Sequence, residues 1–443
     1  MTSEWRTTKL SNVAKIVGGG TPSTTKSDYW NGNIPWITPR DLSDHKDKYI
    51  SRGSRTITDL GLEESSAKLV PKGTVLYTSR APIGYVAIAS QSLCTNQGFK
   101  SLVLNEGYDS RFFYYLLKHH TPEIESRATG TTFKEISGTA LANYEVKIPP
   151  QQIQINVANF LAAIDDLITQ LRETNKTLEA IATGVFKSWF VNFDPVRAKQ
   201  EGKKPEGMDE ATASLFPDNF EQSELGEIPK GWYYGKIGDV ATVKSGFAFK
   251  GQSFSDSGLP VIKIKNILGD GTVDLQNIQY IKSNIANVNK KFSLNDGDII
   301  IAMTGATIGK TGIVVKDELT PYLNQRVAKF DKKLDGPNNG WFIYTAFQNK
   351  NISEQVLNIA SGSAQPNIST SGIESIRLII PRDLTIIDIF NTFSYSLFEN
   401  WILNQKKIAT LSKIFDILLP RLISGQIRLS DEEEINSKIK VDA

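Results

Sequence analysis

The sequence predicts an α+β protein in which two homologous mixed α/β domains are each followed by one long helix. The first observation is an internal repeat, since Trp5 returns as Trp232 and Pro149 returns as Pro381. A repeat of about 230 residues is far longer than a solenoid unit, which runs roughly 20–50 residues. The second observation is a heptad pattern of apolar residues behind each copy. This design suits a protein that contacts two similar targets at once.

The two domains are expected at residues 1–150 and 232–383. Short apolar runs bounded by Gly, Pro or Asp indicate strands, and two amphipathic stretches, 111–119 and 340–349, indicate short helices. The segment 191–231, rich in charge, Pro and Gly, is expected to be an exposed connector, and 425–443 a solvated tail. The expected strands include 75–77, 85–88, 261–264, 299–303 and 312–315.

The long helices are expected at 151–190 and 384–424, and about forty helical residues span roughly 60 Å. Apolar residues at alternating steps of four and three predict coiled-coil packing, although each helix could instead only cover its own domain. Thr174 is the polar member of the first seam, and Asn404, near a stutter in the second, is expected to fix register. The other predicted seam residues are Ile153, Val157, Phe160, Ile164, Leu167, Leu171, Leu178, Ile181, Leu397, Trp401, Ile408, Leu411 and Phe415.

The composition is that of an ordinary soluble protein, with 40% hydrophobic and 22% charged residues. A single cysteine, Cys94, excludes an internal disulfide and fits the cytoplasm, where we expect the protein to act. Three histidines and one thiol make a metal site improbable. We expect neither a signal peptide nor a membrane span. The net charge of +2 leaves DNA binding open, because basic residues can gather on one face.

One motif could suggest an enzyme. Gly305, Gly309, Lys310 and Thr311 follow an apolar strand and resemble a phosphate-binding P-loop, but three residues separate the glycines where that motif has four. The alternative function is therefore a P-loop-like nucleotide-binding enzyme centred on Lys310. The glycines at 18–20 are interpreted as a flexible loop. No other catalytic motif is present, which favours a recognition protein.

Polar side chains recur at matching loops of the two copies. Arg, Lys, Asn and Gln can contact base edges, while Ser and Thr hydroxyls can hold phosphates. Asn96 and Asn324 could instead cap turns. The candidate DNA contacts are Thr38, Arg40, Thr78, Ser79, Arg80, Asn96, Gln97, Thr131, Thr132, Lys134, Lys263, Lys265, Thr304, Lys310, Asn324, Gln325, Arg326, Ser363 and Gln365.

The order of these elements resembles the specificity (S) subunit of type I restriction-modification systems. The first copy carries GGGTPS…YWNGNIPWITPRDL, TSRAPIG and IPPQQIQINVANFLAAID, and FKSWFVNFDPV follows its helix. The second copy carries SGFAFKGQSF, LPVIKIKNI, DGDIIIAMTGATIGKTGIV and a closing LLPRLISGQI. The resemblance covers nearly the whole chain.

That resemblance implies two target recognition domains in a pseudo-two-fold arrangement, separated by an antiparallel coiled coil. Each domain would read one half of a split, asymmetric double-stranded DNA target, and the helices would set the unread spacer. Two methylase subunits would dock on the helices and methylate adenine at N6 with S-adenosylmethionine. Two motor-nuclease subunits would cleave unmodified DNA with ATP and Mg²⁺. The chain itself would hold no cofactor and no catalytic residue. A free-standing DNA-binding scaffold or regulator is the remaining alternative.

Overall fold

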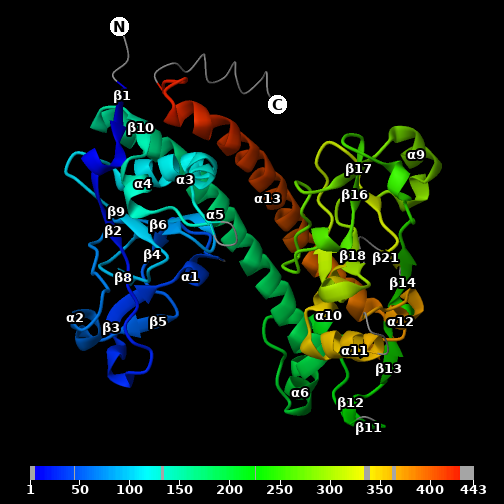
Figure 1. Cartoon of the computed structure of the whole chain (residues 1–443). Helices are drawn as coiled ribbons and strands as arrows, with labels where there is room; N and C mark the ends of the chain where they lie inside the picture. Colours follow the sequence, from blue (N-terminus) through cyan, green and yellow to red (C-terminus); the bar gives the residue numbers. More distant parts are fainter. Residues whose placement is uncertain are drawn as a thin grey trace. The chain divides into compact units, whose positions relative to one another are not determined.

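The computed structural model describes residues 5–43, 45–130, 134–224, 226–333, 340–361 and 366–429. The chain forms two compact units (Figure 1). The first unit contains Met1–Gln170 and Ala409–Ala443, and the second contains Leu171–Ile408. The long helices α5 (Gln151–Lys187) and α13 (Thr385–Ile423) each contribute residues to both units. No helix within the described ranges is long and apolar enough to cross a membrane.

The first unit has three sheets. Their strand orders are β2-β9-β6-β7-β4, β5-β3-β8 and β1-β10. Its largest core cluster joins the five-stranded sheet to α3, α5 and the end of α13. The strands are β1 Arg6–Lys9, β2 Ala14–Gly18, β3 Trp30–Ile37, β4 Tyr49–Ile50, β5 Arg55–Ile57, β6 Val75–Ser79, β7 Ile83–Ala89, β8 Cys94–Thr95, β9 Lys100–Leu104 and β10 Glu145–Ile148. The short helices are α1 Pro39–Ser43, α2 Asp59–Glu63, α3 Ser110–Ser126 and α4 Gly138–Ala142.

The second unit repeats this plan with the orders β14-β21-β18-β19, β15-β17-β16-β20 and β13-β22. The strands are β13 Trp232–Lys236, β14 Ala241–Ser245, β15 Phe254–Ser255, β16 Leu259–Ile262, β17 Gln279–Ile281, β18 Ile299–Ala302, β19 Thr311–Ile313, β20 Tyr322–Leu323, β21 Val327–Lys332 and β22 Arg377–Pro381. The helices are α8 Ile237–Val240, α9 Ser283–Val288, α10 Gly340–Phe347, α11 Lys350–Ala360 and α12 Thr370–Glu374.

The register of the strands shows that the two units are copies of one design. The parallel pair of Trp36 with Cys94 in the first unit corresponds to Val261 with Tyr322 in the second. The first and last strands of each copy also pair, β1 with β10 and β13 with β22. The predicted α+β class and the internal repeat are therefore confirmed. The expected strands are present with bounds shifted by a few residues, and 264 belongs to a 3-10 turn that follows β16.

Each long helix holds its own domain through a buried amide. Gln154 on α5 accepts a hydrogen bond from the backbone N–H of Asp109, the residue that caps α3, at 3.1 Å. Asn391 on α13 accepts one from the N–H of Phe342 in the first turn of α10 at 3.0 Å. The first turn of a helix has N–H groups without intrahelical partners, so these amides satisfy donors that would otherwise be buried and unpaired.

The two long helices pack against each other in antiparallel directions. In the second unit Asn175 of α5 bonds Asn404 of α13, while Phe186, eleven residues further along α5, contacts Phe390, fourteen residues earlier on α13. In the first unit Leu161 of α5 lies in the same core cluster as Leu418 of α13. The predicted helix bounds differ from the observed ones by a few residues.

The buried face of α5 differs from the predicted seam. Leu167 and Ile181 are each 43% exposed, and Thr174 is exposed, whereas the next residue along is buried in all three places: Ile168, Asn175 and Ala182. The physical reason is that α5 packs on a recognition domain as well as on α13, so its buried face is wider than a two-helix seam. On α13 the predicted Trp401, Asn404 and Ile408 are buried, and Phe398 and Ile402 extend that face. Ile153, Phe160, Ile164, Leu178, Leu397 and Phe415 are partly buried against the cores.

The segment 191–231, which was expected to be an exposed connector, is mostly exposed but also contains regular secondary structure. It contains α6 (Asp194–Gln200), α7 (Glu210–Ser214) and the hairpin β11 (Phe220–Ser223) with β12 (Gly226–Pro229). Val196, Phe216 and Ile228 are buried, and the Phe216 ring lies 5.4 Å from that of Trp189 and 6.3 Å from that of Trp232. These few, widely spaced apolar residues thus anchor a highly charged segment to the core of the second unit.

The glycines after β2 are also packed rather than flexible. A Cβ on Gly19 would lie 2.1 Å from the carbonyl oxygen of Asn96, and one on Gly246 would lie 2.5 Å from that of Asn324. Only glycine allows the chain to pass this close to the neighbouring strand. The same crossing in both copies positions the turn that begins with each asparagine.

Candidate nucleic-acid interface

Three polar loops meet at one place in the first unit. They are the end of β6 at Ser79, the β8–β9 turn at residues 96–98, and the segment 134–137 before α4. The N–H of Ser79 donates to the carbonyl of Gly98 at 2.7 Å, and the N–H of Ile136 donates to the carbonyl of Ser79 at 3.0 Å. These main-chain bonds fix the three loops against one another. We call this arrangement the first junction.

The second unit contains the same arrangement, which we call the second junction. The N–H of Met303 donates to the carbonyl of Arg326 at 3.0 Å, and the N–H of Ile368 donates to the carbonyl of Met303 at 2.9 Å. Thr304 and Asn367 pair as an isolated β-bridge. A hollow of about 490 Å³ opens there, lined by Met303, Thr304, Gln325, Arg326, Asn367, Ile368 and Ser369.

The paired asparagines shape a turn in each junction. The side-chain oxygen of Asn96 accepts from the N–H of Gly98 at 2.9 Å, and that of Asn324 accepts from the N–H of Arg326 at 3.4 Å. Such a bond to the backbone two residues on is the usual role of asparagine in turns. The turn leaves Gln97 and Gln325 exposed at its tip. Gln97 is held there by a hydrogen bond with Thr21.

Four residues that were predicted to contact DNA are buried instead, so the structure corrects the prediction at these positions. Thr78 and Ser79 have no exposed surface, and their hydroxyls bond the carbonyls of Pro82 at 2.8 Å and Gly98 at 3.2 Å. Thr304 and Asn324 are 6% exposed. The side chains of Thr78, Ser79 and Asn324 satisfy backbone groups where strands enter the junctions. All four side chains are out of reach of a ligand on the surface.

Several of the other candidates are exposed or half-exposed. Thr38 is turned inward to Asp41. Its backbone N–H and its hydroxyl both donate hydrogen bonds to the Asp41 carboxylate, at 2.8 and 2.6 Å. Lys263 bonds Gln279 and lies 3.7 Å above the Phe254 ring, and burial lowers its pKa. The exposed candidates are Arg40, Gln97, Lys134, Lys265, Lys310, Gln325 and Arg326, while Arg80 is half-exposed. Thr131, Thr132, Ser363 and Gln365 lie outside the described residues.

Two residues of the junctions, Glu135 and Asn367, were not predicted from the sequence. Glu135 lies within ion-pair distance of two cations of the first junction, 3.7 Å from Arg80 and 3.5 Å from Lys100. Asn367 is exposed and lines the hollow of the second junction. In the sequence the two positions carry different side chains, a glutamate and an asparagine, so the repeat itself does not single them out.

A buried pair of amides lies between α5 and α13 in the second unit. Asn404 donates to the side-chain oxygen of Asn175 at 2.9 Å, and Asn175 donates to the backbone carbonyl of Trp401 at 3.2 Å. Asn404 was expected on this seam and is buried there, whereas the polar residue expected on the α5 seam was Thr174 and the buried one is Asn175. The two residues satisfy each other where water is excluded.

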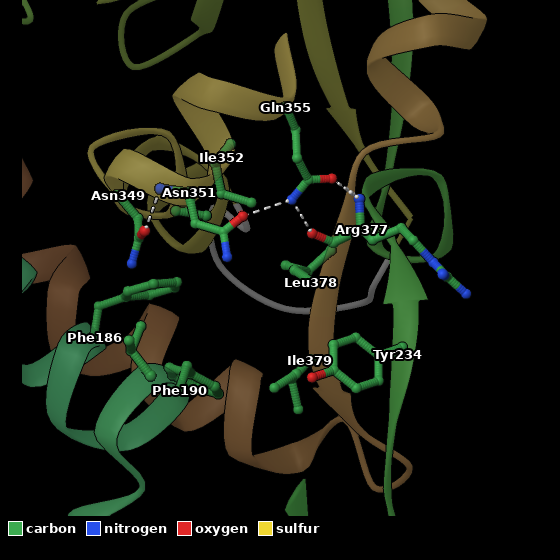
Figure 2. Close-up of a pocket in the computed structure, with 12 residues that line it drawn as sticks. Phe186, Phe190, Tyr234, Asn349, Asn351, Ile352, Gln355, Arg377, Leu378 and Ile379 are labelled. Atoms are coloured by element: carbon green, nitrogen blue, oxygen red, sulfur yellow. Dashed lines mark hydrogen bonds between the residues drawn. The ribbon is translucent and has the colours of Figure 1, made fainter. Parts of the chain in front are cut away.

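A second hollow of about 500 Å³ opens in the second unit beside the end of α5, α11 and β22 (Figure 2). Phe186, Phe190 and Ile352 give it an apolar wall. Gln355 lines the same hollow. Its side-chain oxygen accepts a hydrogen bond from the backbone N–H of Arg377 at 2.8 Å, and its side-chain nitrogen donates one to the Arg377 carbonyl at 2.9 Å. This pair of bonds ties α11 to β22, and the predicted DNA contacts lie at other places in the unit.

The segment 305–311 does not have the geometry of a P-loop. A P-loop leads into a helix whose N-terminus faces the phosphates, whereas here a 3-10 turn at Gly305–Thr307 leads into strand β19. Thr311 is buried in that strand, and the Lys310 ammonium donates to the carbonyl of Leu268 at 3.2 Å. The nucleotide-binding alternative therefore loses its structural basis.

Comparison with known proteins agrees with this architecture. The family model described as "Type I restriction modification DNA specificity domain" matches residues 2–180 and 229–413. The chain is 33% identical over 432 residues to the type I restriction enzyme MjaIX specificity subunit of Methanocaldococcus jannaschii, covering 97% of this chain and 94% of the relative. It is 27% identical to the HindI specificity subunit of Haemophilus influenzae, covering 71% and 76%.

A solved structure has the same fold. The S subunit of a type I restriction-modification system from M. genitalium matches with a TM-score of 0.57 at 17% identity, covering 95% of this chain and 99% of that one. Both copies of the repeat, both long helices and nearly the full length are thus shared with relatives of one kind. The chain therefore belongs to the family of type I restriction-modification specificity subunits, which recognise DNA and carry no active site of their own.

Proposed function

We propose that each unit reads one half of a split DNA target through its junction, and that the chain directs a type I restriction-modification complex to that target. The observation that supports this proposal most directly is the duplicated junction. The same three loops, tied by the same main-chain bonds, present different side chains in the two copies. Loops that share one set of main-chain bonds and carry several different exposed side chains suit sequence reading, because base contacts must be held in place to discriminate.

The exposed side chains match the chemistry of base and phosphate recognition. Arg326 can bond both acceptors of a guanine edge, and Gln97 and Gln325 can bond adenine. Lys134, Lys265 and Lys310 can neutralise phosphates, which supplies affinity without sequence information. In this proposal the amides at the turn tips specify bases and the lysines position the duplex.

The long helices set the distance between the two half-sites. With 37 residues in α5 and 39 in α13, each helix extends roughly 55–60 Å at 1.5 Å per residue. That length is somewhat less than two turns of duplex DNA at about 34 Å per turn. The unread spacer would then follow from helix length, separately from the sequences that the junctions read.

The exposed apolar residues on the helices support docking of methylase subunits. In the second unit Ile181 of α5 and Phe393 and Leu403 of α13 are 40–49% exposed. Exposed apolar side chains of this kind are available for contact with a partner subunit, and a contiguous patch of them is typical of protein interfaces. We propose two methylase and two motor-nuclease subunits as partners in the cytoplasm. They supply the chemistry, with S-adenosylmethionine for adenine N6 methylation and ATP with Mg²⁺ for cleavage.

The test is a map of adenine methylation in cells that express this chain with its cognate methylase, compared with the methylase alone. New methylation at one split motif, present only with this chain, is expected and would also give both half-sites and the spacer. If the complex forms and no new methylation appears, the sequence-reading role is wrong. A DNA-binding scaffold or regulator would then explain the fold better.

A further inference from the structure

One position in the junctions carries a carboxylate in the first unit and an amide in the second. Ile136 and Ile368 make the same bond, donating to the carbonyls of Ser79 and Met303 at the ends of β6 and β18. The residues directly before them, Glu135 and Asn367, are therefore equivalent. The backbone around this position is fixed in both copies, through a bridge to Thr129 for Glu135 and a bridge to Thr304 for Asn367.

Glu135 is an unusual residue for a surface that meets DNA. A carboxylate repels phosphates and every acceptor on a base edge, and a repulsion of this kind is strong when water is excluded. Its cost is reduced here because Arg80 and Lys100 lie 3.7 and 3.5 Å away, which leaves the group of three with a net positive charge. The two cations also hold the carboxylate in place, and Arg80, which is half-exposed, can itself contact a neighbouring phosphate.

The favourable contact for a carboxylate is an amino group. In the major groove cytosine offers only the N4 amino donor, whereas guanine offers two acceptors, thymine offers O4, and adenine offers one donor beside one acceptor. A carboxylate therefore favours cytosine and disfavours guanine and thymine. An asparagine amide both donates and accepts, which matches the N6 and N7 edge of adenine.

We propose that Glu135 and Asn367 are equivalent specificity-determining residues, with Glu135 accepting from cytosine in the first half-site and Asn367 pairing with adenine in the second. This inference rests on the proposed function and goes beyond it, because it assigns one base pair of each half-site to one side chain. It also explains how copies with one backbone can read an asymmetric target.

The test exchanges the two side chains, in the full chain assembled with its methylase. Glu135→Asn is expected to change the preferred base at one position of the first half-site from cytosine to adenine and to leave the second half-site and spacer unchanged. Asn367→Glu is expected to make the reverse change in the second half-site only. Since one good pair contributes about 1–3 kcal/mol, discrimination at that position should change by roughly 5–150-fold. The readout is the methylation motif.

The unchanged half-site serves as an internal control for folding and assembly. Glu145→Asn, which changes an exposed carboxylate on β10 outside the junctions, is the matched control and should leave the motif unaltered. An unchanged first half-site in both Glu135→Asn and Glu135→Ala overturns the assignment, as does loss of both half-sites together. If the unaltered chain directs methylation to no split motif, the proposed function itself is wrong. The experiment with the unaltered chain therefore distinguishes a failure of the proposed function from a failure of the assignment of Glu135 and Asn367.

Discussion

The half-buried carboxylate of Glu179 makes the stability of the second unit depend on pH. Burial on α5, together with the nearby Asp270 carboxylate, raises the pKa of Glu179 to about 7, whereas a glutamate in an unfolded chain titrates near 4.3. A raised folded-state pKa means that the stability contributed by this group is present below the unfolded pKa and is lost as the pH rises through 7.

We therefore expect Glu179→Gln to stabilise the second unit at alkaline pH, by up to roughly 3 kcal/mol above pH 8, with the gain shrinking toward pH 5. Thermal unfolding of the full chain at pH 5.5 and pH 8.5 measures this difference. Glu173→Gln, an exposed position on the same helix, is the control and should shift little at either pH. A gain of equal size at both pH values would contradict the prediction.

At the residue scale, the sequence predicted which polar loops recur in the two copies better than which side chains face outward. Thr78 and Ser79 were interpreted as DNA contacts, yet their hydroxyls turn into the fold because the strand end needs partners for its backbone groups. Polarity alone does not distinguish a side chain that satisfies the backbone from one that faces a ligand. Glu135 was not predicted because what marks it is its proximity to Arg80 and Lys100, and both residues are distant from it in sequence.

At the element scale, the heptad pattern located both long helices, and the packing of the domains decided which face is buried. The heptad pattern predicts that Leu167 and Ile181 are buried on α5, but Ile168 and Ala182 are the buried residues. A period of 3.5 residues identifies a coiled coil but not the second surface against which a helix also packs. The helices and the hairpin within the charged segment 191–231 were not predicted for a related reason, since its few apolar residues are too widely spaced to give a periodic pattern.

The Asn175–Asn404 pair gives a prediction at this scale. Asn404→Ala should destabilise the chain by about 1–3 kcal/mol, because it leaves the buried Asn175 side-chain oxygen without its donor. The double change of both residues to Leu should cost much less than the single change, because no buried polar group is then left unpaired. Chemical denaturation of the full chain measures both.

Lys176→Ala is the matched control, because Lys176 forms only an exposed ion pair with Glu173 on the same helix and such pairs contribute a few tenths of a kcal/mol. A double variant as unstable as the single one would contradict the unpaired-amide explanation. It would indicate that the loss comes from shape mismatch in the helix pair.

At the scale of the whole molecule, helix length and base reading should be separable. Inserting seven matched residues into α5 and α13 beside Asn175 and Asn404 adds two turns, about 10 Å, to each helix. The spacer should lengthen by about three base pairs, at 3.4 Å per pair, with both half-sites unchanged. The methylation motif in cells measures the change.

A seven-residue insertion at the exposed residues 203–204, in the segment between the repeats, is the control and should leave the spacer as it was. A lengthened pair of helices that keeps the original spacing would contradict the role of helix length. A changed half-site would show instead that the insertion had disturbed a recognition domain.

During synthesis on the ribosome, the two recognition domains are completed in the reverse of their genetic order. The second unit emerges as one continuous stretch, whereas the core around Leu161 needs Leu418 and Leu422 from the last helix. At roughly 5–20 residues per second, that helix follows Leu161 after on the order of 10–50 s. A premature stop codon late in α13 would therefore damage the domain encoded first, and spare the one encoded beside it.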